Sequence, residues 1–226
     1  MKFRTVYQFR WVLVIFFIAF IYVSGLVLIE LPFLRINFPS KDLNMGLIPF
    51  LLSFFPRLSF EMQIYNIQTV VAWTIGIILG SRLGAITLGI YLLLGLVGLP
   101  IFAGGGGFDY FKEPTFGYLI SFPVNAYLSG FFYSKNKKIL AVILPIFSTH
   151  ILGILYLLLF KLDFLDITWH LSFSMIGYDL IFTLLLTPVI PILRIILNEM
   201  VIQEIAVRES FVKKEEERFK KRYKSI

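Results

Sequence analysis

One acidic side chain lies well inside an apolar stretch near the end of the chain. Asp179 stands within residues 172–197, in the sequence Gly177-Tyr-Asp-Leu-Ile181. A carboxylate at membrane depth is energetically costly, and such a residue by default marks a functional site. Counted from residue 172, Asp179 lies about 10 Å below the outer end of a helix. We therefore expect Asp179 to bind a ligand by accepting N–H groups.

Four consecutive glycines at 104–107 separate two other apolar stretches, 84–99 and 115–133. As a helix, the uncharged run 85–99 would span only about 22 Å, less than the ~30 Å hydrocarbon core of a bilayer. The glycines should therefore lie within the leaflet, where non-helical backbone is tolerated only if protein buries it or if it lines a cavity. Glycine backbone allows a ligand to approach closely. The loop is thus either the wall of a cavity or a turn that packs helices together.

Two further polar side chains stand in apolar stretches, Asn125 in 115–133 and His150 in 139–160. A single amide in such a helix more often bonds a neighbouring helix than a ligand. A lone histidine is usually a packing residue, and no ligand at metal-binding spacing accompanies this one. The chain has no cysteine, which excludes disulfides and thiolate chemistry. Without a nucleophile–base pair or a metal cluster, we expect neither enzyme activity nor a cofactor or metal.

The composition indicates the class of protein that must position these residues. The chain has 226 residues, of which 58% are hydrophobic and 15% charged, and its mean hydropathy is +0.84. A soluble domain of this size could not bury that much apolar surface. We predict an all-α integral membrane protein, with one six-helix membrane domain over 1–198 and a charged cytoplasmic tail over 199–226. The six predicted spans are 11–29, 64–80, 84–99, 115–133, 139–160 and 172–197.

The basic residues predict the orientation of these spans. If the N-terminus is cytoplasmic, sixteen lysines and arginines fall on the inner side and five on the outer side. An excess of basic residues marks the cytoplasmic side of a membrane protein. Both termini are therefore expected in the cytoplasm of a protein of the plasma (inner) membrane.

The segment 30–62 joins the first two predicted spans. It contains MGLIPFLLSFFP at 45–56, which is too short to cross the hydrocarbon core. We expect an interfacial or re-entrant segment on the outer side, acting either as a lid on a pocket or as a strap that packs on the bundle.

Several short motifs resemble one family. Besides the four glycines, they are Gly80-Ser-Arg-Leu-Gly84, Tyr91-Leu-Leu-Leu-Gly95, Gly98-Leu-Pro-Ile-Phe-Ala103 and Pro114-Thr-Phe-Gly-Tyr-Leu119. These strings resemble the signature of BioY, the biotin-specific S component of energy-coupling-factor (ECF) vitamin transporters. The resemblance implies that the chain captures biotin, with a transmembrane coupling subunit and two ATPase subunits as partners. In agreement, the chain has no GxxxxGK[ST] loop of its own.

A biotin ligand suits the predicted cavity, because its ureido ring carries two N–H donors and its body is apolar. The family pattern around the acid is Gly-Asp-Leu-Ile-Lys, whereas this chain has Tyr178-Asp-Leu-Ile-Phe182. The cation is missing, and Lys112 is the candidate to replace it. The predicted substrate-binding residues are Tyr91, Phe102, Gly104, Gly105, Gly106, Gly107, Tyr118, Asn125 and Asp179.

The alternative is a proton-coupled secondary transporter of another small vitamin-like solute, with Asp179 and His150 as a proton relay. The chain lacks the internal repeat that many such carriers have. The expected surroundings are the lipid bilayer in either case, and no nucleic-acid partner is expected.

Overall fold

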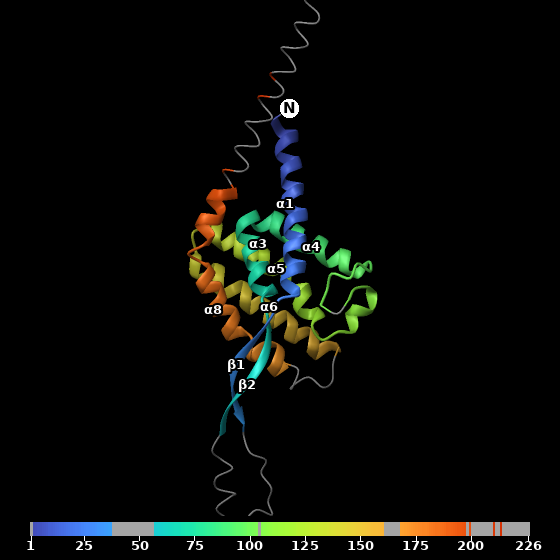
Figure 1. The fold of residues 1–226 in the computed structure, drawn as a ribbon, viewed down its shortest axis with the longest axis vertical. Helices are drawn as coiled ribbons and strands as arrows, with labels where there is room; N and C mark the ends of the chain where they lie inside the picture. Colours follow the sequence, from blue (N-terminus) through green and yellow to red (C-terminus); the bar gives the residue numbers. More distant parts are fainter. Residues whose placement is uncertain are drawn as a thin grey trace, which may run out of the picture.

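The computed structural model describes residues 2–37, 57–103, 105–160 and 168–197, together with Glu199, Ser210 and Lys213. It is mostly helical (Figure 1). In chain order the elements are α1 (Lys2–Gly25), β1 (Leu28–Asn37), β2 (Arg57–Asn66), α3 (Gln68–Leu79), α4 (Ser81–Leu96), η1 (Phe108–Lys112), α5 (Phe116–Ser134), α6 (Lys138–Phe160), η2 (Trp169–Phe173) and α8 (Ile176–Leu186). The predicted tail and the apolar run 45–56 fall outside the described residues, apart from three positions in the tail.

Every predicted span contains a helix. The last one is broken, because α8 is followed by a second helical piece at Ile190–Leu197, bent by 55°. Pro188 lies in the break, where proline removes a backbone donor and the helix bends. By length and hydropathy, only α6 among the described helices is long and apolar enough to cross a membrane, or two if the bent pair counts as one span. α3 and α4 have 12 and 16 residues, which is about 18 and 24 Å.

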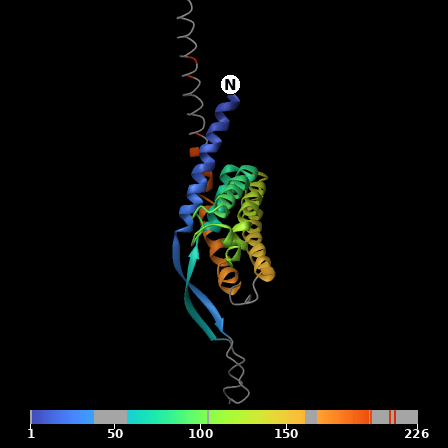
Figure 2. The same ribbon diagram turned by 90° about the vertical axis from the view of Figure 1, so that its right-hand side faces the viewer.

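The expectation of an all-α fold is wrong in one place. β1 and β2 pair as an antiparallel ribbon, which projects from the helical body (Figures 1 and 2). In β2, Phe60, Met62 and Ile64 are exposed, whereas Gln63 and Tyr65 are buried. This period of two is typical of a strand. The prediction extended the second span back to residue 64 because the residues there are apolar, although their alternation favours a strand.

Small residues bring α3, α4 and α5 into close contact. A Cβ on Gly76 would lie 2.1 Å from the carbonyl oxygen of Ala126, and one on Gly130 would lie 2.4 Å from the carbonyl oxygen of Gly76. Small residues at these positions let the helix backbones approach each other. Gly80 has another role: its φ of +82° separates α3 from α4, in a backbone conformation that glycine adopts readily.

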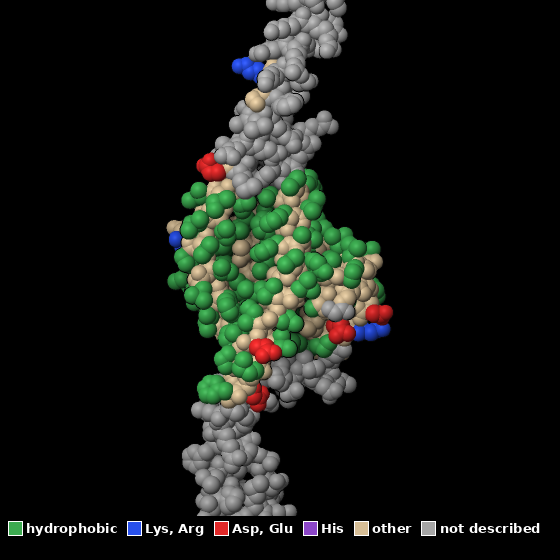
Figure 3. Space-filling view, in the orientation of Figure 1, with side chains coloured by type: hydrophobic (Ala, Val, Ile, Leu, Met, Phe, Trp, Pro, Cys, Tyr) green, Lys and Arg blue, Asp and Glu red, His purple; other side chains and the backbone are tan. Residues whose placement is uncertain are grey.

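Two buried clusters hold the helices together. One is built mainly on α1, α3, α4 and α5 and includes Ile21, Ile75 and Leu88. The other joins α3 to α6 through Trp73 and Ile146. On the face shown in Figure 3, hydrophobic side chains cover the helical body and acidic and basic ones lie at its margins. This distribution suits a body surrounded by lipid.

Candidate functional site

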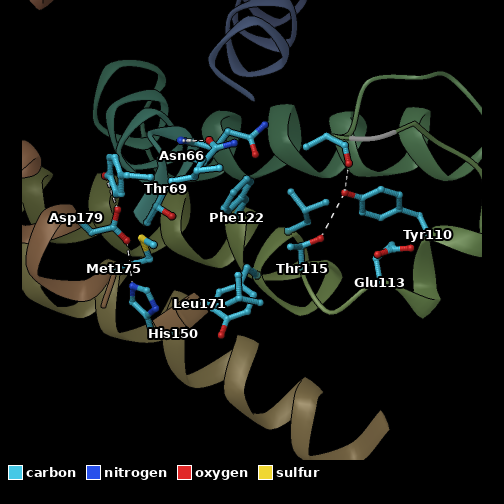
Figure 4. A pocket seen from close by; sticks show the side chains of 16 residues that line it. Asn66, Thr69, Tyr110, Glu113, Thr115, Phe122, His150, Leu171, Met175 and Asp179 are labelled. Atoms are coloured by element: carbon cyan, nitrogen blue, oxygen red, sulfur yellow. Dashed lines mark hydrogen bonds and ion pairs between the residues drawn. The ribbon is translucent and has the colours of Figure 1, made fainter. Parts of the chain in front are cut away.

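A cavity of about 300 Å³ lies between the base of the ribbon and the helices, close to the lower end of the size range of small-molecule sites. β2, α3, α5, α6, η2, α8 and the loop before α5 all contribute to its wall (Figure 4). The lining residues are Ile64, Tyr65, Asn66, Gln68, Thr69, Ala103, Tyr110, Glu113, Thr115, Tyr118, Leu119, Phe122, His150, Leu171, Met175 and Asp179.

Asp179 is at one end of this cavity and is 1% exposed. The Tyr65 hydroxyl donates to Oδ1 at 2.7 Å, and His150 Nε2 lies 3.0 Å from Oδ2. Asp179 also stands in the first turn of α8, where the helix dipole favours a negative charge. A buried carboxylate needs such partners, because burial without them would be costly. The carboxylate is thus held in place by groups from β2 and α6.

Aromatic packing fixes Tyr65 at this position. Its ring stacks on Phe182 with a centroid distance of 5.2 Å and an interplanar angle of 17°, and it lies 5.8 Å from the ring of Tyr178. The Tyr178 hydroxyl donates to the carbonyl of Pro32 in β1. Both strands are therefore attached to α8. The ring of Phe182 thus serves as the platform for Tyr65.

His150 brings a second polar group to the same end. The residue is 3% exposed, and its Nδ1 atom has no hydrogen-bond partner among the described residues. Nδ1 is itself buried, so the imidazole acts here through its contact with Asp179. The carboxylate of Asp179 lines the cavity and can accept further hydrogen bonds from a ligand that has N–H groups.

The middle of the cavity is apolar. Leu119 and Phe122 line it from α5, Leu171 from η2, and Met175 from the turn before α8. Tyr118 closes this part, with its hydroxyl 2.6 Å from Ser172 Oγ and its ring at the edge of His150. These side chains suit a flat apolar ligand body.

The far end of the cavity is formed by the loop between α4 and α5. Figure 4 shows Tyr110, Thr115 and Glu113 at the opposite side of the view from Asp179 and His150. The Tyr110 hydroxyl donates to the Ala103 carbonyl at 2.7 Å and lies 3.4 Å from Thr115 Oγ1. Glu113 is exposed. The cavity thus has a buried polar end, an apolar middle and an acidic end near solvent.

The structure brings two of the nine predicted site residues, Tyr118 and Asp179, to the cavity wall. The described glycines lie behind that wall, against the end of α4. The Gly107 N–H donates to the Gly95 carbonyl at 2.7 Å and the Gly105 N–H to the Phe102 carbonyl at 3.0 Å. Gly104 lies outside the described residues.

The other three predicted residues are buried away from the cavity wall. Tyr91 and Phe102 pack edge to face, with ring centroids 5.5 Å apart. Asn125 donates from Nδ2 to Thr149 Oγ1 at 3.0 Å, which joins α5 to α6. Such an interhelical bond is the more common use of a single amide in an apolar helix.

Lys112, the candidate to replace the missing cation, does not line the cavity. Its Nζ lies 2.7 Å from Asp109 Oδ1, and both side chains are largely exposed. The hydrogen bond and the charge of each partner lower the pKa of Asp109 and raise the pKa of Lys112. This pair therefore stays charged on the surface over the physiological pH range.

The hydrogen bond between Tyr65 and Asp179 was not predicted from the sequence, and His150 was considered only as part of a proton relay in the alternative function. Tyr65 was counted as part of an apolar span, and only the period-two pattern of β2 could have shown that it faces inward. The residue types of Glu113 and Thr115 gave no signal, because only the fold brings this loop to the cavity. Among the described residues, no group of three or more His, Asp or Glu side chains could hold a metal ion.

The chain is similar in sequence to several proteins described as probable biotin transporters. The chain is 36% identical over 84 residues to a probable biotin transporter BioY from Lysinibacillus sphaericus, covering 37% of this chain and 43% of that protein. It is 31% identical over 116 residues to one from Pyrococcus horikoshii, covering 51% and 62%. A third, from Bacillus subtilis, is 30% identical over 131 residues, covering 56% and 69%. The first two matches therefore span less than two thirds of those relatives.

Among solved structures, the chain is similar to the S component for biotin from an ECF-type ABC transporter, with a TM-score of 0.45 and 23% identity, over 88% of this chain and 90% of that one. The family model described as BioY matches residues 45–199. That match covers more than half of the sequence, and the chain therefore belongs to the BioY family.

Proposed function

We propose that this chain is a membrane subunit that captures biotin from the outside for ATP-driven uptake with an ECF module. The observation that carries the proposal is the carboxylate of Asp179, which is held by Tyr65 and His150 at the buried end of a cavity. The chain that contains it belongs to the BioY family. The relatives are described as probable biotin transporters. A substrate-binding subunit of this kind is not an enzyme.

The cavity matches the chemistry of biotin in three parts. The ureido N–H groups donate to the carboxylate of Asp179, whose two oxygens can each accept more than one hydrogen bond. The fused rings lie against Phe122, Leu119 and Met175. The valeryl chain extends toward Thr115. A site built to hydrogen-bond N–H groups rejects ligands that lack them, because its buried polar groups would be left unpaired.

The predicted site residues divide into two groups under this proposal. Asp179 and Tyr118 contact the ligand. Tyr91, Phe102, Asn125 and the glycines 105–107 support the wall from behind, through the contacts that hold the loop on α4 and α5 on α6.

The energy for uptake comes from other subunits, because the sequence has no nucleotide-binding loop. A transmembrane coupling subunit and two ATPase subunits are the proposed partners. We also propose that the chain is a multi-pass protein of the plasma (inner) membrane with both termini, and thus the charged tail over 199–226, on the cytoplasmic side.

One observation favours the second candidate, a proton-coupled carrier. Asp179 and His150 are in direct contact at 3.0 Å, as a proton relay requires. Uptake into energised vesicles separates the two functions. Uptake that collapses with the proton gradient and needs no ATP supports the carrier, and uptake that needs ATP and the partner subunits supports the proposal.

The decisive test is a binding titration of the purified full chain in detergent, without nucleotide. We expect biotin to bind in a 1:1 ratio, and thiamine and riboflavin to give no signal. Saturation with another vitamin but not with biotin would overturn the proposal.

A further inference from the structure

The short turn between α5 and α6 carries three lysines within residues 135–138, namely Lys135, Lys137 and Lys138, and all three are exposed. Hydrogen bonds fix the turn. The N–H groups of Asn136 and Lys137 donate to carbonyls of the last turn of α5, both at 3.0 Å, and Asn136 has a φ of +57°. Helices commonly end in this way, with a left-handed residue after the last turn. The three ammonium groups are therefore presented together at one end of the α5–α6 pair.

The exposed side of α5 leads to this turn. Ile120, Val124 and Tyr127 are 39%, 40% and 44% exposed, and their spacing of four and three residues places them on one face of the helix. The ring of Tyr127 stacks on Phe131, with centroids 5.9 Å apart and an interplanar angle of 12°. Lys135 Nζ then lies 4.5 Å from the centroid of the Phe131 ring, within the range of a cation–π contact. The lysine thus stands at the end of an apolar stripe.

α6 continues the same pattern from the other side of the turn. It begins at Lys138, and the next residue, Ile139, is 73% exposed, followed by Ile143 and Phe147 at 38% and 40%. α5 and α6 pack side by side at one edge of the helical body (Figure 2). In a body surrounded by lipid, exposed apolar stripes contact the acyl chains. Long basic side chains and aromatic rings at the ends of such stripes lie at the level of the headgroups.

From this arrangement we infer that the α5–α6 turn binds the headgroup of an anionic phospholipid, whose acyl chains lie along the exposed stripes of α5 and α6. The lysines attract the negative charge of the headgroup, and a zwitterionic headgroup gains less because it also carries a positive charge. Free phosphate has the charge but cannot contact the stripes. The three lysines do not line the cavity, so this lipid site is separate from the proposed biotin site and goes beyond the proposed function.

The test uses three probes: phosphatidylglycerol, phosphatidylcholine with the same acyl chains, and inorganic phosphate. Each is titrated into the purified full chain in detergent while the melting temperature is followed, and native mass spectrometry counts the lipids that stay bound. We expect phosphatidylglycerol to reach its half-maximal effect at about one tenth of the concentration that phosphatidylcholine needs, or less, since each lysine near an anionic lipid strengthens binding about fivefold. High salt should reduce this preference, because salt screens exposed charges.

Variants of the turn locate the binding. Lys135→Gln should reduce the preference for phosphatidylglycerol about fivefold, and replacement of all three lysines by glutamine should abolish it. Lys112→Gln is the matched control, since Lys112 is an exposed lysine near the opposite end of α5 and is paired with Asp109. It should leave the preference unchanged. The melting temperature of each variant without added lipid shows that it is folded.

Three outcomes would overturn the inference. Equal effects of the two lipids would remove the preference for an anionic headgroup. A preference that survives in the triple variant would show that the anionic lipid binds elsewhere on the protein. An effect of inorganic phosphate as large as that of phosphatidylglycerol would show that the turn binds phosphate without the acyl chains. None of these results bears on biotin binding, so the proposed function stands or falls by its own titration.

Discussion

At the scale of single residues, Asp179 is fixed by its neighbours before any ligand arrives. The Tyr65 hydroxyl and His150 Nε2 both reach it from other elements. An acid without partners would destabilise the empty protein, and its removal would relieve a buried charge. Asp179 has two buried partners instead, and removal of the acid leaves both of them unpaired.

Asp179→Ala should therefore affect both stability and binding. We expect the empty protein to lose about 1–3 kcal/mol of stability, the usual cost of unpaired buried polar groups, and biotin binding to fall below detection. Thermal melts of wild type and variant, each with and without biotin, measure both effects. A variant that keeps the full ligand-induced shift would contradict the binding role of Asp179.

Tyr65→Phe isolates the hydroxyl, because the ring and its stacking on Phe182 remain. The carboxylate loses one hydrogen bond, and bonds to charged groups contribute about 1.5–3 kcal/mol. We expect a lower melting temperature of the empty protein. Tyr127→Phe is the matched control, since Tyr127 is exposed and does not line the cavity. Equal melting temperatures for the two variants would show that the Tyr65 hydroxyl contributes nothing to stability.

At the scale of elements, the glycines differ in what surrounds them. A Cβ on Gly76 would lie 2.1 Å from the Ala126 carbonyl, whereas one on Gly89 in α4 meets nothing within 4 Å. Backbone atoms cannot move aside as side chains do, so an added side chain must push α3 and α5 apart.

We therefore expect Gly76→Val to destabilise the protein by about 1–3 kcal/mol or more, and Gly89→Val to have a much smaller effect. The fraction of folded protein recovered in detergent and its melting temperature measure the difference. Similar losses for the two variants would mean that the contact between α3 and α5 does not depend on a bare glycine face.

The glycine loop gives a second comparison of this kind. A Cβ on Gly106 would lie 2.0 Å from the Leu99 carbonyl, but Gly105 has open space and a φ of +140°. Gly106→Ala should lower the melting temperature of the empty protein through this clash. A loss of biotin affinity with no change in the melting temperature would instead make Gly106 part of the ligand contact.

Sequence patterns located the helices but not all of the site. Apolar runs between charged or glycine-rich loops are a strong signal, and for that reason each predicted span contains a helix. Asp179 was recognised because an acid in such a run is rare. Tyr65, Glu113 and Thr115 are common residue types in ordinary surroundings. Their role depends on contacts between segments far apart in the chain, which no local pattern encodes.

At the scale of the whole molecule, the orientation in the membrane is directly testable. The chain contains no cysteine, so an introduced cysteine is the only thiol. With both termini cytoplasmic, Ser134→Cys should react with a membrane-impermeant maleimide only after the cells are opened, and Asp109→Cys should react in intact cells. The reverse pattern would contradict the predicted topology.

The alternation of buried and exposed side chains along β2 also limits where residues can be inserted into this protein or deleted from it. Tyr65 reaches Asp179 because it stands an even number of residues from other inward-facing positions of the strand, such as Gln63. Inserting one residue just before Tyr65 would present the opposite face of the strand to α8, and inserting two would restore it. Lineages that keep this cavity should therefore gain or lose residues at this point of the ribbon in pairs.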